Sequence, residues 1–196
     1  MVKYVTCCLC ILFFLIGCGR QLPVVQKIAP LPAQGSCSIA VLPFLNESTY
    51  PQGGAIVNKV FLSELAGSGH FQIIQEGDVL ELYQQLFLYP NQLPNREQLE
   101  MIGGRLNPDL FVGGVVQKMA KQKTGNFVDT ELTLGLLLYD GKSGEILWTT
   151  YHRRLGGEYQ QLLHLGRINT ITGLARRMSQ EIITDWLKQG MTPCTE

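Results

Sequence analysis

The side chains of residues 127–139 alternate in character from one residue to the next, and this period of two constrains the fold more than any other feature. Successive side chains of a β-strand point to opposite faces, so one face of this segment is mainly apolar. That face carries Val128, Thr130, Leu132, Leu134, Leu136 and Leu138. Turn-forming residues 140–144 follow, and residues 145–152 are predicted to return as a second strand. The sequence therefore predicts an antiparallel hairpin with one buried face.

Short strands and helices alternate along the chain before this hairpin. Apolar runs predict strands at residues 38–44, 71–75 and 110–116, and a loop at 119–126. Helical spacing predicts a helix ending at Gly67, a second after Asp78 as its N-cap, a third at 95–106 and a last at 168–188. Asn95 and Gln98 have the spacing of a capping box. The order β-α-β-α-α-β-β-β-α predicts the α/β class, as a single α/β sandwich with a mixed sheet.

The first residues of the chain have the pattern of an export signal. Lys3 precedes an apolar run at residues 5–16, which is shorter than the roughly 20 residues that a bilayer-spanning helix needs. Leu15-Ile16-Gly17-Cys18 resembles a lipobox, which predicts a signal peptide at 1–17 and lipidation of Cys18. The alternative is a plain membrane anchor with incidental cysteines. Gly19 stands where aspartate would favour the inner membrane, so we expect an outer-membrane lipoprotein that faces the periplasm.

Residues 18–36 are rich in proline and have no strand or helix period, which predicts a lipid-anchored tether before a domain at 37–196. Cys37 and Cys194 lie at the two edges of that domain. Because an exported protein meets an oxidising compartment, we expect a disulfide between them. The alternative is a pair of free thiols.

Composition and residue spacing exclude several classes of function. The chain has 16 Lys and Arg against 16 Asp and Glu, so it lacks the basic surface that nucleic acid requires. His70, His152 and His164 have no second ligand at a metal-binding spacing, so no metal and no cofactor is expected. Asp129 and Glu131 share one face of a strand and offer acid–base chemistry, although solvated surface residues are the simpler interpretation. With no catalytic constellation, we expect a protein that is not an enzyme.

Two segments are candidates for binding a partner protein. Phe87 and Tyr89 extend beyond the apolar stripe of a predicted helix and lack an obvious cover. Tyr159, Leu162 and Leu163 lie in the connection between the last strand and the last helix. This second group either faces a partner or folds back over the sheet.

Four segments together resemble the superfamily of envelope lipoproteins that contains CsgG and the TolB N-terminal domain. They are IAVLPF at 39–44 with Asn46 after it, FQII at 71–74 leading into Asp78, PDLFVGG at 108–114, and LYDGKSGEILW at 138–148. In size and in its predicted lipid anchor, the chain is closer to the LpoB-like and PelC-like members than to CsgG.

This resemblance implies a non-enzymatic outer-membrane lipoprotein whose periplasmic domain binds partner proteins, including other copies of itself as a homo-oligomer, in an envelope assembly or export system. An LpoB-like regulator of a cell-wall synthase is one alternative. A small envelope hydrolase that uses Asp129 and Glu131 or a histidine is another. A shared fold alone does not choose between them.

Overall fold

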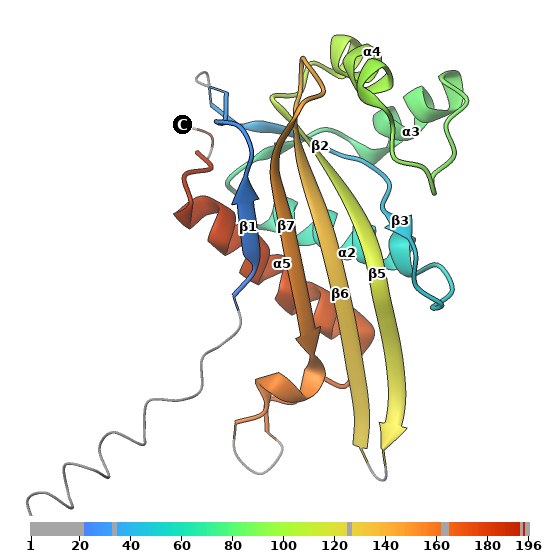
Figure 1. The fold of residues 1–196 in the computed structure, drawn as a ribbon, viewed down its shortest axis with the longest axis vertical. Coiled ribbons are helices and arrows are strands. Elements are labelled where there is room, and N and C mark those ends of the chain that lie inside the picture. The colour runs from blue at the N-terminus through green and yellow to red at the C-terminus, as the bar shows by residue number, and fades with distance from the viewer. Residues whose placement is uncertain (1–21, 33–34, 125–126, 162–164, 193, 195–196) are drawn as a thin grey trace, which may run out of the picture.

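The computed structural model describes residues 22–32, 35–124, 127–161, 165–192 and 194 of the chain (Figure 1). Its centre is a mixed seven-stranded sheet in the order β1-β7-β6-β5-β2-β4, with β3 also paired to β5. The strands are β1 (Val24–Lys27), β2 (Ser38–Val41), β3 (Leu45–Asn46), β4 (Gln72–Ile73), β5 (Leu110–Thr124), β6 (Phe127–Asp140) and β7 (Ile146–Leu155). Strand β2 pairs in parallel with β4 and β5, whereas β5, β6, β7 and β1 form an antiparallel run.

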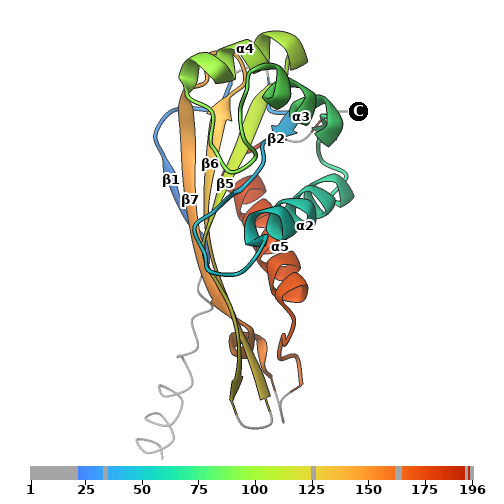
Figure 2. The ribbon, with the colours of Figure 1, turned by 90° about the vertical axis from the view of Figure 1, so that its right-hand side faces the viewer.

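Helices α2 (Gly53–Gly67) and α5 (Ile171–Lys188) lie side by side over one face of the sheet (Figure 2). The predicted leucine face of β6 packs under them in the larger hydrophobic cluster. Trp186 of α5 is completely buried there. Its indole N–H donates a hydrogen bond to Thr150 Oγ1 at 2.8 Å, and its ring meets that of Phe61 with 5.9 Å between centroids. The α/β sandwich is confirmed.

Helices α3 (Glu76–Gln85) and α4 (Arg96–Leu106) pack against the other face at the end of the sheet where β5 begins. Alternation along β2 points Ala40 and the following Leu42 toward them, whereas Ile39 and Val41 join the α2–α5 side. Farther along the same face, Tyr151 and Leu155 of β7 are 46% and 36% exposed. The second pair of helices therefore covers only part of its face.

Two buried tyrosines in this second cluster predict an alkaline loss of stability. Burial raises the pKa of Tyr139 to about 12, and it also raises the pKa of Tyr83, with Tyr139 adding to that effect. Unfolded tyrosine ionises near pH 10, so this contribution to folding is complete below pH 10 and falls as the pH rises further. The Tyr83 hydroxyl is buried without a hydrogen-bond partner in the described part of the chain.

We therefore expect Tyr83→Phe to leave the free energy of unfolding at pH 7 unchanged or slightly higher, and to weaken the loss of stability between pH 10 and pH 12. Urea unfolding across that range measures both effects, and absorbance at 295 nm follows the ionisation itself. A loss of more than about 1 kcal/mol at pH 7 would mean that the hydroxyl makes a stabilising hydrogen bond.

Several element boundaries differ from those predicted. The loop expected at 119–126 is wrong, because β5 continues to Thr124 and pairs with β6 along its length, with a bulge between Val116 and Lys118. Helix α3 begins at Glu76, so Asp78 lies in its first turn and is not its N-cap. The capping box at Asn95 is confirmed, since each of Asn95 and Gln98 accepts a hydrogen bond from the other's backbone N–H at 2.9 Å.

Strand β1 lies inside the segment predicted as the tether at 18–36. Val24–Lys27 pair with the edge of β7, with Val24 opposite Tyr151. The strand is held on its inner side by Lys27, whose ammonium lies 4.9 Å from the centre of the Trp148 ring and donates to the Gln189 carbonyl at 2.6 Å. The folded part of the chain thus begins before Cys37.

A disulfide joins Cys37, just before β2, to Cys194, just after α5, with 4.6 Å between the Cα atoms. The Cys194 N–H also donates to the His70 carbonyl at 2.8 Å. The predicted signal peptide and Cys18 lie outside the described residues. Within the residues that are described, no helix is both long and apolar enough to cross a membrane.

Candidate functional site

Phe87 is the residue whose conformation and exposure are hardest to explain by folding alone. After α3 the chain closes a Schellman motif: the Leu88 N–H donates to the Tyr83 carbonyl at 2.8 Å and the Phe87 N–H donates to the Gln84 carbonyl at 3.1 Å. This motif places Phe87 in the left-handed region with φ 54, where glycine is favoured. The Phe87 side chain is nevertheless 90% exposed. An exposed aromatic at a strained position suggests a role outside the fold.

Tyr89 and Pro90 continue this exposed feature. The Gln92 N–H donates to the Tyr89 carbonyl at 3.0 Å, which closes a turn with Pro90 at its favoured second position. Tyr89 is 71% exposed. Leu88 between the two aromatics is buried and so fixes the segment to the domain. We call Phe87, Tyr89 and Pro90 the aromatic loop.

Pro90 also lines a groove of about 280 Å³ between α2 and α3, which we call the α2–α3 groove. The other lining residues come from β2 and the turn after it, from α2 and from α3: Val41, Pro43, Phe44, Ala55, Asn58, Lys59, Glu76, Val79 and Leu80. Most of them are apolar, and Lys59 and Glu76 form an ion pair of 3.7 Å. An apolar hollow with a few polar groups is typical of a binding site.

Local packing holds the groove open. The Phe44 ring lies flat over Gly114 of β5, where a Cβ atom would come within 2.6 Å of the ring. Asn58 of α2 is buried, and its amide donates to the Leu42 carbonyl at 2.8 Å, so α2 is fixed to the chain after β2. Both contacts are inside the core, so the groove is formed without a ligand.

The second candidate group consists of Tyr159, Leu162 and Leu163, in the connection between β7 and α5. Tyr159, in the 3-10 helix η1 (Gly156–Tyr159), folds back against α5, and its hydroxyl donates to Glu181 Oε2 at 3.0 Å. Of the two alternatives, Tyr159 therefore follows the one in which the connection covers the sheet. Leu162 and Leu163 lie outside the described residues, as does His164.

The acidic residues considered for catalysis do not converge on a common point. Glu131 is bound by Lys118 at 2.8 Å and by Arg153 at 2.7 Å, and the Lys118 hydrogen bond, with Arg153 assisting, holds its pKa below the ordinary value. Asp129 forms an ion pair with Arg167 instead. In the described ranges no group of three or more potential ligands could hold a metal ion.

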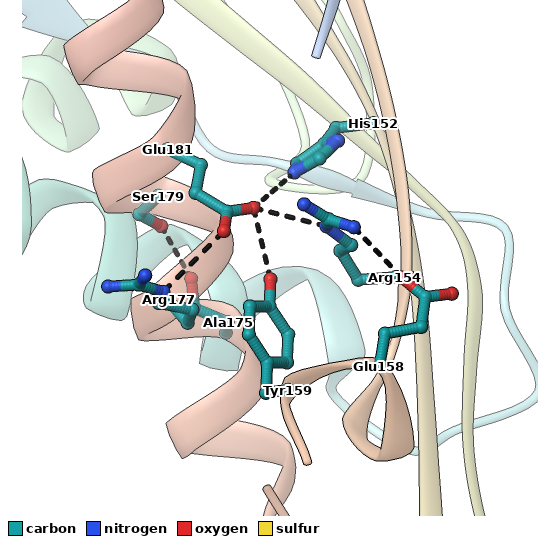
Figure 3. A network of polar contacts seen from close by, with 8 residues as sticks. All are labelled: His152, Arg154, Glu158, Tyr159, Ala175, Arg177, Ser179 and Glu181. Carbon is teal, nitrogen blue, oxygen red and sulfur yellow. Dashed lines mark hydrogen bonds and ion pairs between the residues drawn. The ribbon is translucent and has the colours of Figure 1, made fainter. Parts of the chain in front are cut away.

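A buried charged network, which sequence reasoning missed, is centred on Glu181 of α5 (Figure 3). Glu181 Oε2 accepts hydrogen bonds from Arg154 Nε at 3.2 Å and from Tyr159, and lies 2.8 Å from His152 Nε2. Its second oxygen is 3.5 Å from Arg177 Nε. The side chains of His152 and Arg154 are only 1% and 3% exposed. Burial, and then the charge of Glu181, raises the pKa of Tyr159. The network connects β7, η1 and α5, which is a structural role.

No protein-family model matches the chain, and neither does any curated protein. Solved structures do. The PelC dodecamer from Paraburkholderia phytofirmans matches with a TM-score of 0.53 and 16% identity, over 83% of this chain and 96% of that chain. Lipoprotein GNA1162 from Neisseria meningitidis matches with a TM-score of 0.55 and 18% identity, over 78% of this chain and 99% of that one. The LpoB C-terminal domain from Escherichia coli is less similar, with a TM-score of 0.47 and 16% identity over 74% and 92%.

At these identities the likeness is one of fold. The chain has the α/β fold seen in PelC and in lipoprotein GNA1162. For PelC, the resemblance in sequence motifs is therefore accompanied by a shared fold. The wider link to CsgG and TolB stays a prediction.

Proposed function

We propose that the chain is a non-enzymatic lipoprotein, anchored at the outer membrane through Cys18, whose periplasmic domain binds other proteins in an envelope assembly or export system. The lipobox and the fold shared with lipoprotein GNA1162 support the setting. The single observation that carries the binding role is Phe87, which is 90% exposed in a left-handed backbone conformation. The aromatic loop and the α2–α3 groove together form the binding surface.

The chemistry of this surface favours a protein segment with apolar side chains as the partner. Aromatic residues next to a preformed hollow dominate the energetics of many protein interfaces. One apolar side chain of the partner would fill the groove, while Phe87 and Tyr89 lose their contact with water. A second copy of the chain is one candidate, since PelC of the same fold is a dodecamer. A regulator that binds a cell-wall synthase is the alternative. Light scattering of the purified protein distinguishes the two, because only self-binding gives a defined multiple of the monomer mass.

Phe87→Gly is expected to weaken partner binding while leaving the domain folded. Glycine removes the left-handed strain, so the free energy of unfolding should stay the same or rise by up to about 1 kcal/mol. Loss of the aromatic ring should lower affinity at least about thirtyfold, which is what a side chain worth 2 kcal/mol gives. Photo-crosslinking in cells from a reactive residue at position 89 measures the complex, and urea unfolding measures stability.

Two matched variants complete the experiment. Asn107→Gly makes the same backbone change at the end of α4, where Asn107 has φ 47, and Met101→Ala removes another exposed apolar side chain. Both should keep the cross-linked product. The hydrolase alternative is tested by Asp129→Asn and Glu131→Gln. If these abolish function in a folded protein while Phe87→Gly does not, the proposed binding role is wrong.

A further inference from the structure

The position of β1 changes how far the domain can stand from its lipid anchor. The described chain begins at Leu22, four residues after Cys18, and an extended chain covers at most about 3.5 Å per residue. Cys18 therefore lies within about 14 Å of Leu22, whatever path the chain takes. A domain beginning at residue 37 would have had several times that reach.

The register of β1 on β7 shows which end of the domain lies close to Cys18, and therefore close to the bilayer. Val24 lies opposite Tyr151, so two residues earlier Leu22 is level with Arg153. Arg153 pairs with Thr133 of β6, and Thr133 pairs in turn with Lys118 of β5. The β5–β6 hairpin continues beyond that level, with Lys123 opposite Val128. Lys123 is five residues past Lys118, or about 17 Å along the strand. Because Cys18 lies at most about 14 Å from Leu22, the hairpin end extends at least as far as the anchor. The hairpin end therefore reaches the bilayer together with the anchor.

The charges at this end suit an anionic surface. Lys121 and Lys123 are exposed, and no ion pair is found for either within the described ranges. Lys118 and Arg153 share the single carboxylate of Glu131. Of the remaining charges here, Arg167 pairs with Asp129 and Arg154 with Glu158. Among the described residues of β5 and β6 beyond the level of Val116, basic groups therefore outnumber acidic ones, with Lys121 and Lys123 outside any ion pair.

Apolar side chains accompany these charges. Leu22 is 65% exposed and Leu165 is 68% exposed. Leu165 lies in the connection that follows η1, and this connection contacts β6 through the ion pair between Arg167 and Asp129. Basic residues mixed with exposed leucines are the pattern of surfaces that lie at a lipid headgroup layer.

We propose that this end of the domain, formed by the β5–β6 hairpin with Lys118, Lys121 and Lys123, by Arg153 and by the neighbouring Leu22 and Leu165, rests directly on anionic lipid headgroups. The inference depends on the proposed lipidation of Cys18. It fixes the orientation of the domain, because α3 and α4 lie at the opposite end of the sheet (Figure 1). The aromatic loop after α3 is then held away from the bilayer, where a soluble partner can reach it.

Amine labelling of the full acylated lipoprotein in vesicles tests this orientation. Vesicles of phosphatidylcholine with 30% phosphatidylglycerol are floated on a density gradient, and only the floated protein is analysed. Lys142, exposed in the β6–β7 turn at the far end of the sheet, is the internal control. We expect Lys121 and Lys123 to react at least about fivefold more slowly than Lys142, as a lysine attracted to an anionic surface should. The protection should diminish in 1 M salt, which screens the attraction.

The outcomes separate this inference from the proposed function. Failure of the protein to float would refute the lipid anchor and the orientation with it. Protein that floats but reacts equally at all three lysines would refute the orientation alone. Protection that persists in neutral detergent would mean that protein, such as a second copy, covers the hairpin end, and would also overturn the proposal. A Lys121→Gln, Lys123→Gln double variant should float through its acyl chains but lose the salt-sensitive protection of Lys118. An Arg96→Gln, Arg105→Gln control, which removes two exposed charges from α4 and leaves Lys142 in place, should keep it.

Discussion

Replacing Cys37 and Cys194 together with serine should lower the free energy of unfolding by about 3–5 kcal/mol, one of the two largest losses that we expect from small substitutions. The disulfide joins residues 157 positions apart, and closing a loop of that length in the unfolded chain corresponds to about 5 kcal/mol in the chain-entropy relation. The fold itself should persist, because Ser36 Oγ still donates to the Thr192 carbonyl at 3.0 Å and the Cys194 backbone still bonds to His70.

Urea unfolding of the oxidised protein, the reduced protein and the double variant measures this effect. Reduction of the natural protein should cause the same loss as the substitutions, and the double variant should not respond to reductant. Its m-value should rise, since an unfolded chain without the cross-link exposes more surface. A loss below about 1 kcal/mol would contradict the entropic explanation and would point to native-state strain that offsets it.

Elements with a strong local pattern could be predicted from the sequence, and elements that depend on a neighbour could not. The alternation of residues 127–139 and the turn after it gave the β6–β7 hairpin, because a period of two has only one efficient way to bury its apolar face. Strand β1 has four residues and no such period. It becomes a strand because the edge of β7 offers unpaired backbone groups. Likewise the polar second half of β5 becomes a strand because β6 lies beside it.

The candidate surface was only partly visible in the sequence. Phe87 and Tyr89 could be identified as apolar residues beyond the end of a helix, but the left-handed conformation of Phe87 depends on Leu88 burying itself against the core. The α2–α3 groove brings together residues from four separate segments, so no local pattern encodes it. The sequence indicated that the side chains of Phe87 and Tyr89 are exposed. The structure adds the left-handed backbone conformation of Phe87 and the α2–α3 groove.

A signal for the buried network was nevertheless present. His152 and Arg154 follow Trp148 and Thr150 at intervals of two, so they share the inward face of β7. A buried arginine requires a buried acid. Glu181 lies next to Ile182, which belongs to the inward stripe of α5. Glu181 is the acid that binds the buried arginine. A strand whose inward face carries basic residues therefore predicts an acidic partner on the covering helix.

Glu181→Ala should lower the free energy of unfolding by about 3–5 kcal/mol, the range observed when one partner of a buried charge pair is removed. The Arg154 side chain is 3% exposed, and among the described residues it would retain its ion pair with Glu158 and its contact with the Tyr159 ring. Its terminal nitrogen Nη2 has no hydrogen-bond partner in the described part of the chain. His152 and Tyr159 would each lose their contact with the Glu181 carboxylate as well. Glu181→Gln keeps the shape and one acceptor oxygen, so we expect an intermediate loss.

The control is Glu64→Ala, which removes a carboxylate that also contacts α5. Glu64 accepts from Arg176 at 3.0 Å and from Gln180 at 2.9 Å, but the Arg176 side chain is 68% exposed. A pair of this kind contributes less than about 1 kcal/mol. If Glu181→Ala and Glu64→Ala cause equal losses in urea unfolding, the network is solvated and does not hold β7 to α5. Because the network lies at the η1 end of the sheet, away from α3, a Glu181→Gln protein that is still folded should keep the cross-link at position 89. Loss of that cross-link without unfolding would mean that the two ends of the domain are coupled.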